Sequence, residues 1–222
     1  LPEILRKAYL EGNWDVFAGQ YFSEWDKEKH VCQPFPIPPT WKRFRAYDHG
    51  RDKPASCGWY AIDYDGVVYK YRELYQSGLN IDQIAKEINR LSVGETYEYS
   101  VADPSIFANI GFVDKFGGQT IAESFVRNGI VFIPASNRRI DGWSIFHQYL
   151  YWDDKRGPKM KFFNTCHHSV RTIPSLIHDE HRPEDLDTDG EDHAADEGRY
   201  FLMSLHERKT EKPMTELERE IK

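Results

Sequence analysis

The order of hydrophobic periods along the chain constrains its fold more than any other sequence feature. Three successive segments, residues 43–49, 56–63 and 67–74, have the composition and the period of two that are typical of β-strands. The Asp65-Gly66 pair between the second and third segments is a strong signal for a tight hairpin turn. The first half of the chain therefore predicts three consecutive antiparallel strands.

After Asn80 the period changes to that of an amphipathic helix, with Asn80 as its N-cap. The further expected elements are a strand at 97–102, a helix at 120–129, a strand at 130–133, a helix at 139–152, an edge strand at 161–163, helical residues 166–178 kinked by Pro174, and a last helix at about 191–205. Three antiparallel strands followed by alternating helices and strands indicate an α/β domain, a mixed sheet with helices on both faces. This is the element order of the ribonuclease H-like fold.

The two ends of the chain differ from this alternating middle. Residues 34–39 are rich in proline and predict a stiff extended connector, so the compact domain is expected at 41–206. Residues 1–40, which begin with a short helix at 1–12, are expected to be a linker outside that domain. Residues 207–222 are expected to be a charged, solvated tail.

Composition narrows the class of protein. No run of about 18 apolar residues is present, which argues against a membrane span. The chain does not begin like a signal peptide. The three cysteines, Cys32, Cys57 and Cys166, are widely spaced and odd in number, which argues against a zinc ribbon or a disulfide framework and fits a reducing cytoplasm.

Charge is unevenly distributed within a net charge of −7. Residues 181–197 are strongly acidic, whereas residues 155–178 contain basic side chains and no acid. The candidate DNA-contacting residues are the basic ones of that segment and two arginines before it: Lys155, Arg156, Lys159, Lys161, Arg171, Arg138 and Arg139. Arg43, Arg45, Arg51 and Lys53 around the first strand are the alternative. Ordinary solvated surface explains the same pattern, so charge alone does not decide.

Acidic residues stand at the ends of two expected strands and at the start of the last helix. Asp48 ends the first strand, and Asp103 follows the fourth. Asp192, His193 and Asp196 open the last helix, where residues 193 and 196 share one helix face. Because ligands of open α/β sheets gather at the carboxyl ends of strands, we expect these side chains to meet.

Carboxylates with one imidazole suit two divalent cations, Mg²⁺ or Mn²⁺, that clamp a phosphodiester during hydrolysis. Each residue also has a structural alternative. Asp48 can begin a turn, Asp103 and Asp192 can cap helical segments, and His193 can lie on the surface. Asp196 can pair with Arg199.

Four stretches resemble the nuclease part of the large terminase subunits of tailed bacteriophages. Residues 10–15 (LEGNWD) and 22–26 (FSEWD) resemble the segment that links the ATPase and nuclease parts. Tyr47-Asp48-His49-Gly50 resembles the first nuclease motif and Ala102-Asp103-Pro104-Ser105 the second. Residues 187–200, with Asp-His-x-x-Asp-x-x-Arg-Tyr, resemble the third and most specific motif.

The resemblance implies a ribonuclease H-like endonuclease that cuts concatemeric viral DNA in the host cytoplasm. It implies Asp48, Asp103, His193 and Asp196 as metal ligands and catalytic residues, with Asp192 less consistently a ligand. It also implies a small terminase subunit and a portal or procapsid as partners, and we expect the isolated domain to be monomeric. Glu197-Gly198 departs from the Ala-Leu common before Arg-Tyr in that motif.

The sequence contains no GxxxxGK[ST] phosphate loop, so this chain is not by itself the ATP-driven motor. Residues 1–40 are then expected to be the remnant of a linker to a missing ATPase domain. Two other functions stay open. A Holliday-junction resolvase or integrase-like nuclease of the same fold would share the acids. A non-catalytic domain that docks DNA or the portal would have acids too scattered to bind metal.

Overall fold

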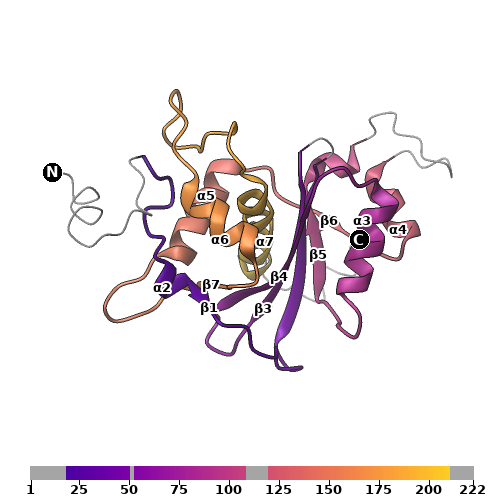
Figure 1. Ribbon diagram of the computed structural model, residues 1–222, viewed down its shortest axis with the longest axis horizontal. Coiled ribbons are helices and arrows are strands. Elements are labelled where there is room, and N and C mark those ends of the chain that lie inside the picture. Colours follow the sequence, from indigo (N-terminus) through magenta and orange to yellow (C-terminus); the bar gives the residue numbers. More distant parts are fainter. Residues whose placement is uncertain (1–18, 51–52, 109–119, 211–222) are drawn as a thin grey trace, which may run out of the picture.

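The computed structural model describes residues 19–50, 53–108 and 120–210. A seven-stranded mixed sheet runs through the middle in the order β1-β7-β4-β3-β2-β5-β6. Helices cover both of its faces, with α5, α6 and α7 on one side and α3 and α4 on the other (Figure 1). The predicted α/β architecture with a mixed sheet is confirmed.

The three antiparallel strands predicted from the period of two form the centre of the sheet. Strands β2 (Lys42–Asp48), β3 (Ala55–Ile62) and β4 (Val68–Gln76) pair in succession, each antiparallel to the next. The turn between β3 and β4 uses Gly66 at a φ of 83°, a conformation that glycine adopts without a steric cost.

Four shorter strands extend the meander with parallel pairs. Strands β5 (Tyr99–Ala102) and β6 (Ile133–Pro134) continue it beyond β2. Strands β7 (Met160–Phe163) and β1 (Val31–Cys32) continue it beyond β4. The first and fourth predicted strands, β2 and β5, are therefore neighbours, as expected.

On one face, α3 (Ile81–Leu91) and α4 (Ile121–Arg127) pack on alternate residues of the sheet. Both helices begin with a capping box, in which the N-cap side chain and the residue three positions later satisfy each other's backbone N–H groups. A short 3-10 helix, η1 (Pro104–Phe107), follows β5.

The other face carries α5 (Arg139–Leu150), α6 (His167–Thr172) with the 3-10 turn η2 (Ile173–Ser175), and α7 (His193–Thr210). Their apolar side chains form a core with Phe44, Ala46 and Tyr60 of the sheet. Helix α7 begins two residues later and ends five residues beyond the predicted 191–205, so the expected charged tail starts inside it. Residues 211–222 lie outside the described residues.

The expected linker before residue 41 differs most from the structure. Tyr21 and Phe22 are buried, and Phe22 packs against Trp143 and Phe146 of α5. Helix α2 (Lys27–His30) and strand β1 follow, so the described part of this segment adds an edge to the sheet and packs as part of the domain. Its aromatic residues lack a periodic pattern because they pack individually. The helix expected at 1–12 lies outside the described residues.

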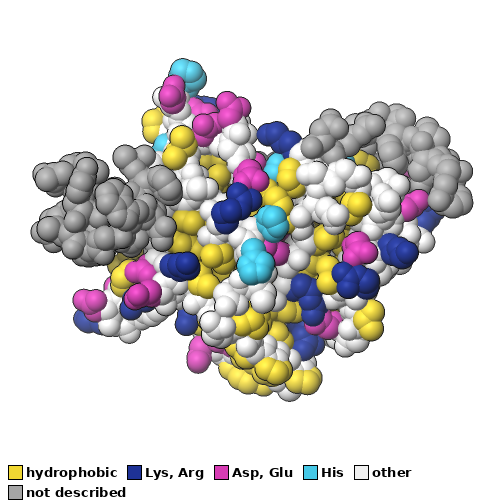
Figure 2. Space-filling view, in the orientation of Figure 1, with side chains coloured by type: hydrophobic (Ala, Val, Ile, Leu, Met, Phe, Trp, Pro, Cys, Tyr) yellow, Lys and Arg dark blue, Asp and Glu magenta, His cyan; other side chains and the backbone are white. Residues whose placement is uncertain are grey.

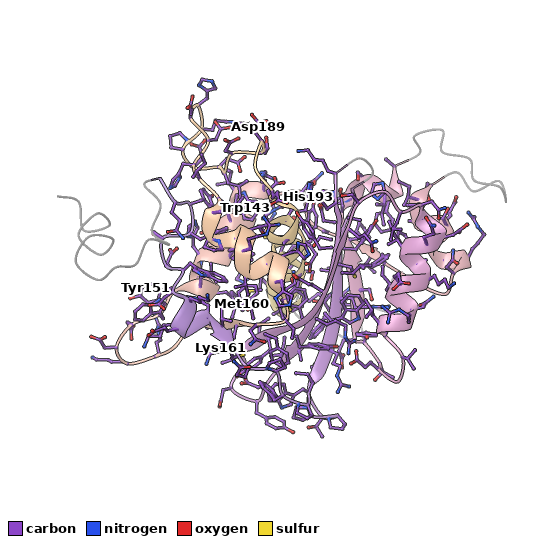
Figure 3. The ribbon with its side chains drawn as sticks, viewed as in Figure 1. Trp143, Tyr151, Met160, Lys161, Asp189 and His193 are labelled. Atoms are coloured by element: carbon purple, nitrogen blue, oxygen red, sulfur yellow. The ribbon has the colours of Figure 1, made fainter. Side chains whose placement is uncertain are left out.

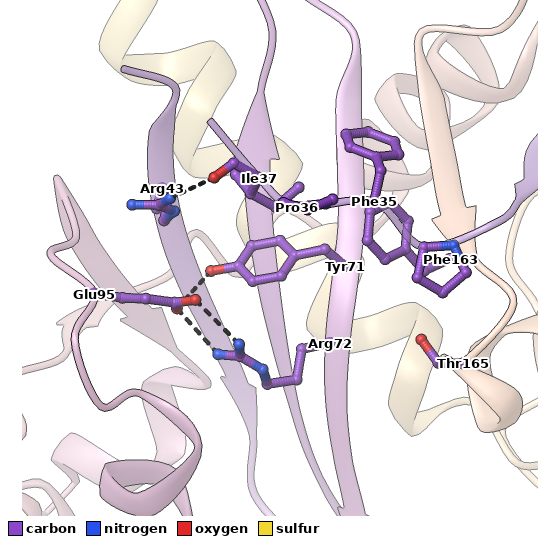
Figure 4. A pocket seen from close by; sticks show the side chains of 10 residues that line it. Phe35, Pro36, Ile37, Arg43, Tyr71, Arg72, Glu95, Phe163 and Thr165 are labelled. Atoms are coloured by element: carbon purple, nitrogen blue, oxygen red, sulfur yellow. Dashed lines mark hydrogen bonds and ion pairs between the residues drawn. The ribbon is translucent and has the colours of Figure 1, made fainter. Parts of the chain in front are cut away.

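The proline-rich connector lies across the edge of the sheet and borders a pocket of about 270 Å³ (Figure 4). Phe35, Pro36 and Ile37 line it together with Tyr71 and Phe163 of the sheet. Tyr71 and Phe163 belong to the core on the α3 side, so the pocket lies on the face away from α7. Among the described residues, no helix combines the length and apolar character that crossing a membrane requires.

Candidate metal centre

Asp48 is the last residue of β2 and lies on the α7 face of the sheet. Phe44 and Ala46 point into the core beneath α7, and strand alternation places Asp48 in step with them. The side chain is buried, and this burial raises the pKa of Asp48 to about 7. The nearby carboxylates of Asp196 and Asp103 raise that pKa further, while a hydrogen bond from His193 opposes them.

His193, the first residue of α7, faces Asp48 directly. Its Nδ1–H donates to Asp48 Oδ2 at 3.0 Å. This hydrogen bond raises the pKa of His193, because the carboxylate stabilises the protonated ring. The start of the last helix and the end of the first strand thus meet, although they are 145 residues apart in the sequence.

Asp103 is brought beside Asp48 by the parallel pairing of β2 with β5. Tyr47 and Ala102 are register partners, and the backbone N–H of Asp103 donates to Tyr47 O at 2.9 Å. The Asp103 carboxylate accepts hydrogen bonds of 2.8 Å from the backbone N–H and from the hydroxyl of Ser105. Asp103 therefore caps η1, its structural alternative, and also stands at the expected strand end.

Asp192 immediately precedes α7 and is buried close to the same histidine. Its Oδ1 lies 3.9 Å from His193 Nδ1. Burial raises the pKa of Asp192 to about 6, and the charge of Asp196 adds to this shift. Together with Asp48, Asp103 and His193 it forms what we call the strand-end cluster.

Asp196 is held differently from the other predicted ligands. Arg139 Nη1 donates to both of its oxygens at 3.0 and 3.1 Å, and Arg199 Nε donates to Oδ1 at 2.8 Å. Arg139 Nε also donates to Asp185 Oδ1 at 2.9 Å, and its Nη2 lies 3.5 Å from Asp192 Oδ2. We call Asp185, Asp196, Arg139 and Arg199 the Arg139 cluster.

Divalent cations fit the strand-end cluster by donor chemistry but not yet by spacing. Carboxylate oxygens and one imidazole suit Mg²⁺ or Mn²⁺, and two of the acids are buried with raised pKa values, so a cation would stabilise their charged forms. Within the described ranges, however, no three acidic, histidine or cysteine side chains converge on one point at ligand distance. His193 and Asp48 are in direct contact, so an ion shared by both requires them to separate.

The basic segment before β7 lies far from these acids. Lys161 is in register with Tyr69 on β4, whereas Asp48 pairs with Ser56, which pairs with Tyr75. The six residues from Tyr69 to Tyr75 span about 20 Å along a strand. Figure 3 shows Lys161 near the opposite end of the sheet from His193. Lys155, Arg156 and Lys159 belong to the loop that precedes this strand, so the structure does not bring them to the site.

Three of the predicted DNA-contacting arginines are engaged in ion pairs. Arg139 lies inside the Arg139 cluster, Arg138 pairs with Glu207, and Arg171 pairs with Glu191 beside Asp192. Basic and acidic side chains are interspersed on the face shown in Figure 2, and no broad basic area stands out among the coloured residues.

Two further residues border the strand-end cluster. Lys53 lies close enough to lower the pKa of His193, although the Asp48 hydrogen bond prevails. Tyr75 has its ring centroid 6.4 Å from that of His193 and stacks on His168. Lys53 was an alternative in the sequence, five positions after Asp48. Tyr75 was missed, because only strand pairing brings it to the site.

No protein-family model matches the sequence, and no curated protein matches it. The structure is similar to the full large terminase of a thermophilic bacteriophage, with a TM-score of 0.67 and 21% identity over 85% of this chain. The chain spans 45% of the length of that terminase.

Two isolated nuclease domains are similar over almost their whole length. The P22 large terminase nuclease domain has a TM-score of 0.67 and 20% identity, over 85% of this chain and 93% of that one. The nuclease of the large terminase of thermophilic phage G20c, solved with bound magnesium, has a TM-score of 0.56 and 15% identity, over 84% of this chain and 97% of that one. The predicted fold, the ribonuclease H-like α/β fold of large terminase nucleases, is confirmed.

Proposed function

We propose that this chain is a metal-dependent endonuclease domain that cuts double-stranded DNA during viral genome packaging. One observation supports it above all others. Asp48 and Asp103 end two neighbouring parallel strands, and His193 meets Asp48 there, within a fold shared with large terminase nucleases. Because fold alone does not specify function, the proposal depends on this arrangement of side chains.

The metal ligands we propose are Asp48 and Asp103, completed by His193 and Asp192 or Asp196. A bound pair of divalent cations would generate hydroxide and neutralise charge on the phosphate oxygens of the cleaved bond. Asp196 joins the ligand set only when Arg139 releases it, because that guanidinium now binds both of its oxygens. Among the structures compared, the G20c nuclease was solved with magnesium and with zinc.

The chain's own side chains orient this site. His193 holds a proton on Nδ1 and directs it at Asp48 Oδ2, which fixes the carboxylate and balances part of its charge. Ser105 orients both oxygens of Asp103 through its backbone N–H and its hydroxyl. The site therefore presents acceptor oxygens from two strands at one edge of the sheet.

Lys53 and Arg171 are the basic residues we propose to hold the DNA backbone next to the site. Lys53 lies near His193, and Arg171 reaches Glu191, which adjoins Asp192. Contacts to phosphates fix position and carry no sequence information, so cutting would be largely non-specific. Lys155, Arg156, Lys159 and Lys161 would contact DNA only beyond the site, at the other end of the sheet.

A non-catalytic domain that docks DNA or the portal is the second candidate. It is favoured by the absence, within the described residues, of three ligands that already converge on one point. The alternative of a branch-specific resolvase has no comparable support, because the similar structures reported above are terminases.

Incubation with supercoiled plasmid and Mg²⁺ or Mn²⁺, with and without chelator, tests the proposal. We expect metal-dependent nicking and linearisation that the chelator abolishes. A four-way DNA junction offered in parallel identifies a resolvase, which would cut the junction and spare the plasmid. If neither substrate is cut with either metal, the domain is a docking module and our proposal is wrong.

The setting that follows from this function is the packaging of viral DNA in the cytoplasm of an infected cell. A motor ATPase, a small terminase subunit and the portal of the procapsid would be its partners. These partners remain proposals, because the chain covers 45% of the full large terminase to which it is similar.

A further inference from the structure

A charged pair is completely buried beneath α7, one helical turn after the metal-site residues. Lys70 of β4 and Glu197 of α7 are both 0% exposed, with Lys70 Nζ 2.5 Å from Glu197 Oε2. The hydroxyl of Tyr60 donates to Glu197 Oε1 at 2.6 Å, and the hydroxyl of Ser56 donates to Oε2 at 3.4 Å. The carboxylate is therefore bound by three side chains from two strands.

This pair shares a helix face and a strand ladder with the metal site. His193 and Glu197 are four residues apart, so they lie one above the other on α7. His193 contacts Asp48, and Glu197 contacts Ser56, the register partner of Asp48. The position of Glu197 on the sheet consequently determines how closely His193 approaches Asp48.

Glycines allow α7 to lie this close. A Cβ atom at residue 58 would come within 2.6 Å of Glu197 Oε2, closer than real Cβ contacts allow. On the other side of the helix, a Cβ at Gly142 of α5 would lie 2.6 Å from Arg199 Cγ. Helix α7 is thus confined between the sheet and α5 without free space at either contact.

Stability alone does not account for a charged pair in this place. Burying two ions costs several kcal/mol each, and apolar residues of similar size often stabilise a fold at least as well. The pair remains ionised, because the Glu197 carboxylate raises the pKa of Lys70 above its ordinary value although burial by itself lowers it. What a charged, hydrogen-bonded pair adds over apolar packing is a defined position.

We infer that Lys70 and Glu197 are positioning residues that hold α7 at the height where His193 meets Asp48. The inference deepens the proposed function, and it rests on that function only where metal binding is concerned. Neither residue touches DNA or metal in this scheme. They act through the helix, by keeping its first turn against the ends of β2 and β5.

Gly58→Ala tests the clamp with both charges still present. The added methyl group displaces the Glu197 carboxylate, whereas Gly157→Ala, where nothing lies within 4 Å of the new Cβ, is the matched control. In metal-free protein, NMR of labelled histidine rings reports the His193 Nδ1–H signal. We expect Gly58→Ala to shift or lose this signal, and Mn²⁺ affinity measured by calorimetry to fall at least about tenfold.

A second variant covers the case in which Gly58→Ala does not fold. Lys70→Met with Glu197→Gln removes both charges at nearly constant volume, a change that buried pairs often tolerate. It should fold, yet lose the same His193 signal and the same fraction of Mn²⁺ affinity. Ile88→Ala, in the core on the opposite face, lowers stability without touching α7 and should leave both readouts unchanged.

The results separate the clamp from the proposed function. If wild type neither binds Mn²⁺ nor cuts DNA while the variants still lose the His193 signal, the nuclease proposal fails and the clamp stands. If wild type binds Mn²⁺ and the double variant keeps both its affinity and its His193 signal, the clamp is wrong and the nuclease proposal is unaffected. Loss of signal in Ile88→Ala would also overturn the clamp, since general destabilisation would then explain it.

Discussion

Two groups of carboxylates lie side by side at the start of α7, and they are neutralised in different ways. In the Arg139 cluster, Asp185 and Asp196 receive hydrogen bonds of 2.8–3.1 Å from arginines. In the strand-end cluster, Asp48 has a histidine as its hydrogen-bond partner, and burial raises its pKa to about 7. By contrast, Arg139 holds the pKa of Asp185 below its ordinary value although burial opposes this.

The difference distinguishes acids that hold the fold from acids that a cation could neutralise. A guanidinium that binds two carboxylates joins α5 to the loop and helix that carry them, and supplies the charge they need. Within the described residues, no lysine or arginine forms an ion pair with Asp48 or Asp103. Those two acids are therefore the better candidates for metal ligands.

Asp48→Asn and Asp103→Asn should produce the largest difference between the clusters. Each removes a metal-binding charge at nearly constant volume, so we expect metal-dependent plasmid cleavage to fall to background while circular dichroism stays that of wild type. Asp185→Asn, in the Arg139 cluster, should retain cleavage and lose stability instead. Full cleavage by either strand-end variant would remove that residue from the catalytic set.

Arg139→Met should produce the next largest effect, in stability. It leaves Asp185 and part of the charge of Asp196 buried without their partner, which we expect to cost about 3 kcal/mol of unfolding free energy in denaturant titrations. The adjacent Arg138→Met is the matched control, because Arg138 is exposed and its ion pairs lie on the surface. We expect no measurable change there, and equal losses in the two variants would refute a structural role for the Arg139 cluster.

The smallest effect is the pH dependence of metal-free stability. The pKa of Asp48 is raised from 3.8 to about 7 in the folded protein, so between about pH 4 and 7 the folded state keeps a proton that the unfolded state has lost. Stability contributed by this group is therefore present at low pH and lost as the pH rises through that window. Asp192, with its pKa raised to about 6, has the same sign.

Asp48→Asn removes this dependence. In thermal unfolding without metal, the variant should equal wild type near pH 4 and exceed it by on the order of 1–2 kcal/mol at pH 8. Added Mg²⁺ should reverse the ranking, because it stabilises only the folded protein that binds it. A wild-type protein that becomes more stable between pH 5 and 8 without metal would contradict an uncompensated Asp48.

The sequence by itself determined the parts of the fold that depend on local periods and turns. The meander at residues 42–76, the capped helices α3 and α4, and the neighbouring ends of β2 and β5 followed from alternation, the Asp65-Gly66 turn and capping boxes. The expectation that acids gather at these strand ends needed only the topology of an open sheet. Each of these features depends on residues close in sequence or on a general rule of chain connection.

Tertiary structure alone decided which charges are matched. Asp196 has the same sequence signal as a metal ligand, yet Arg139, 57 residues earlier, binds it; the basic segment before β7 is near in sequence and about 20 Å away along β4. Glu197 seemed a mere departure from a motif, and only the packing of α7 shows that Lys70, Tyr60 and Gly58 surround it. Charge pairing depends on distances of a few ångströms between distant segments, and linear spacing carries no information about those distances.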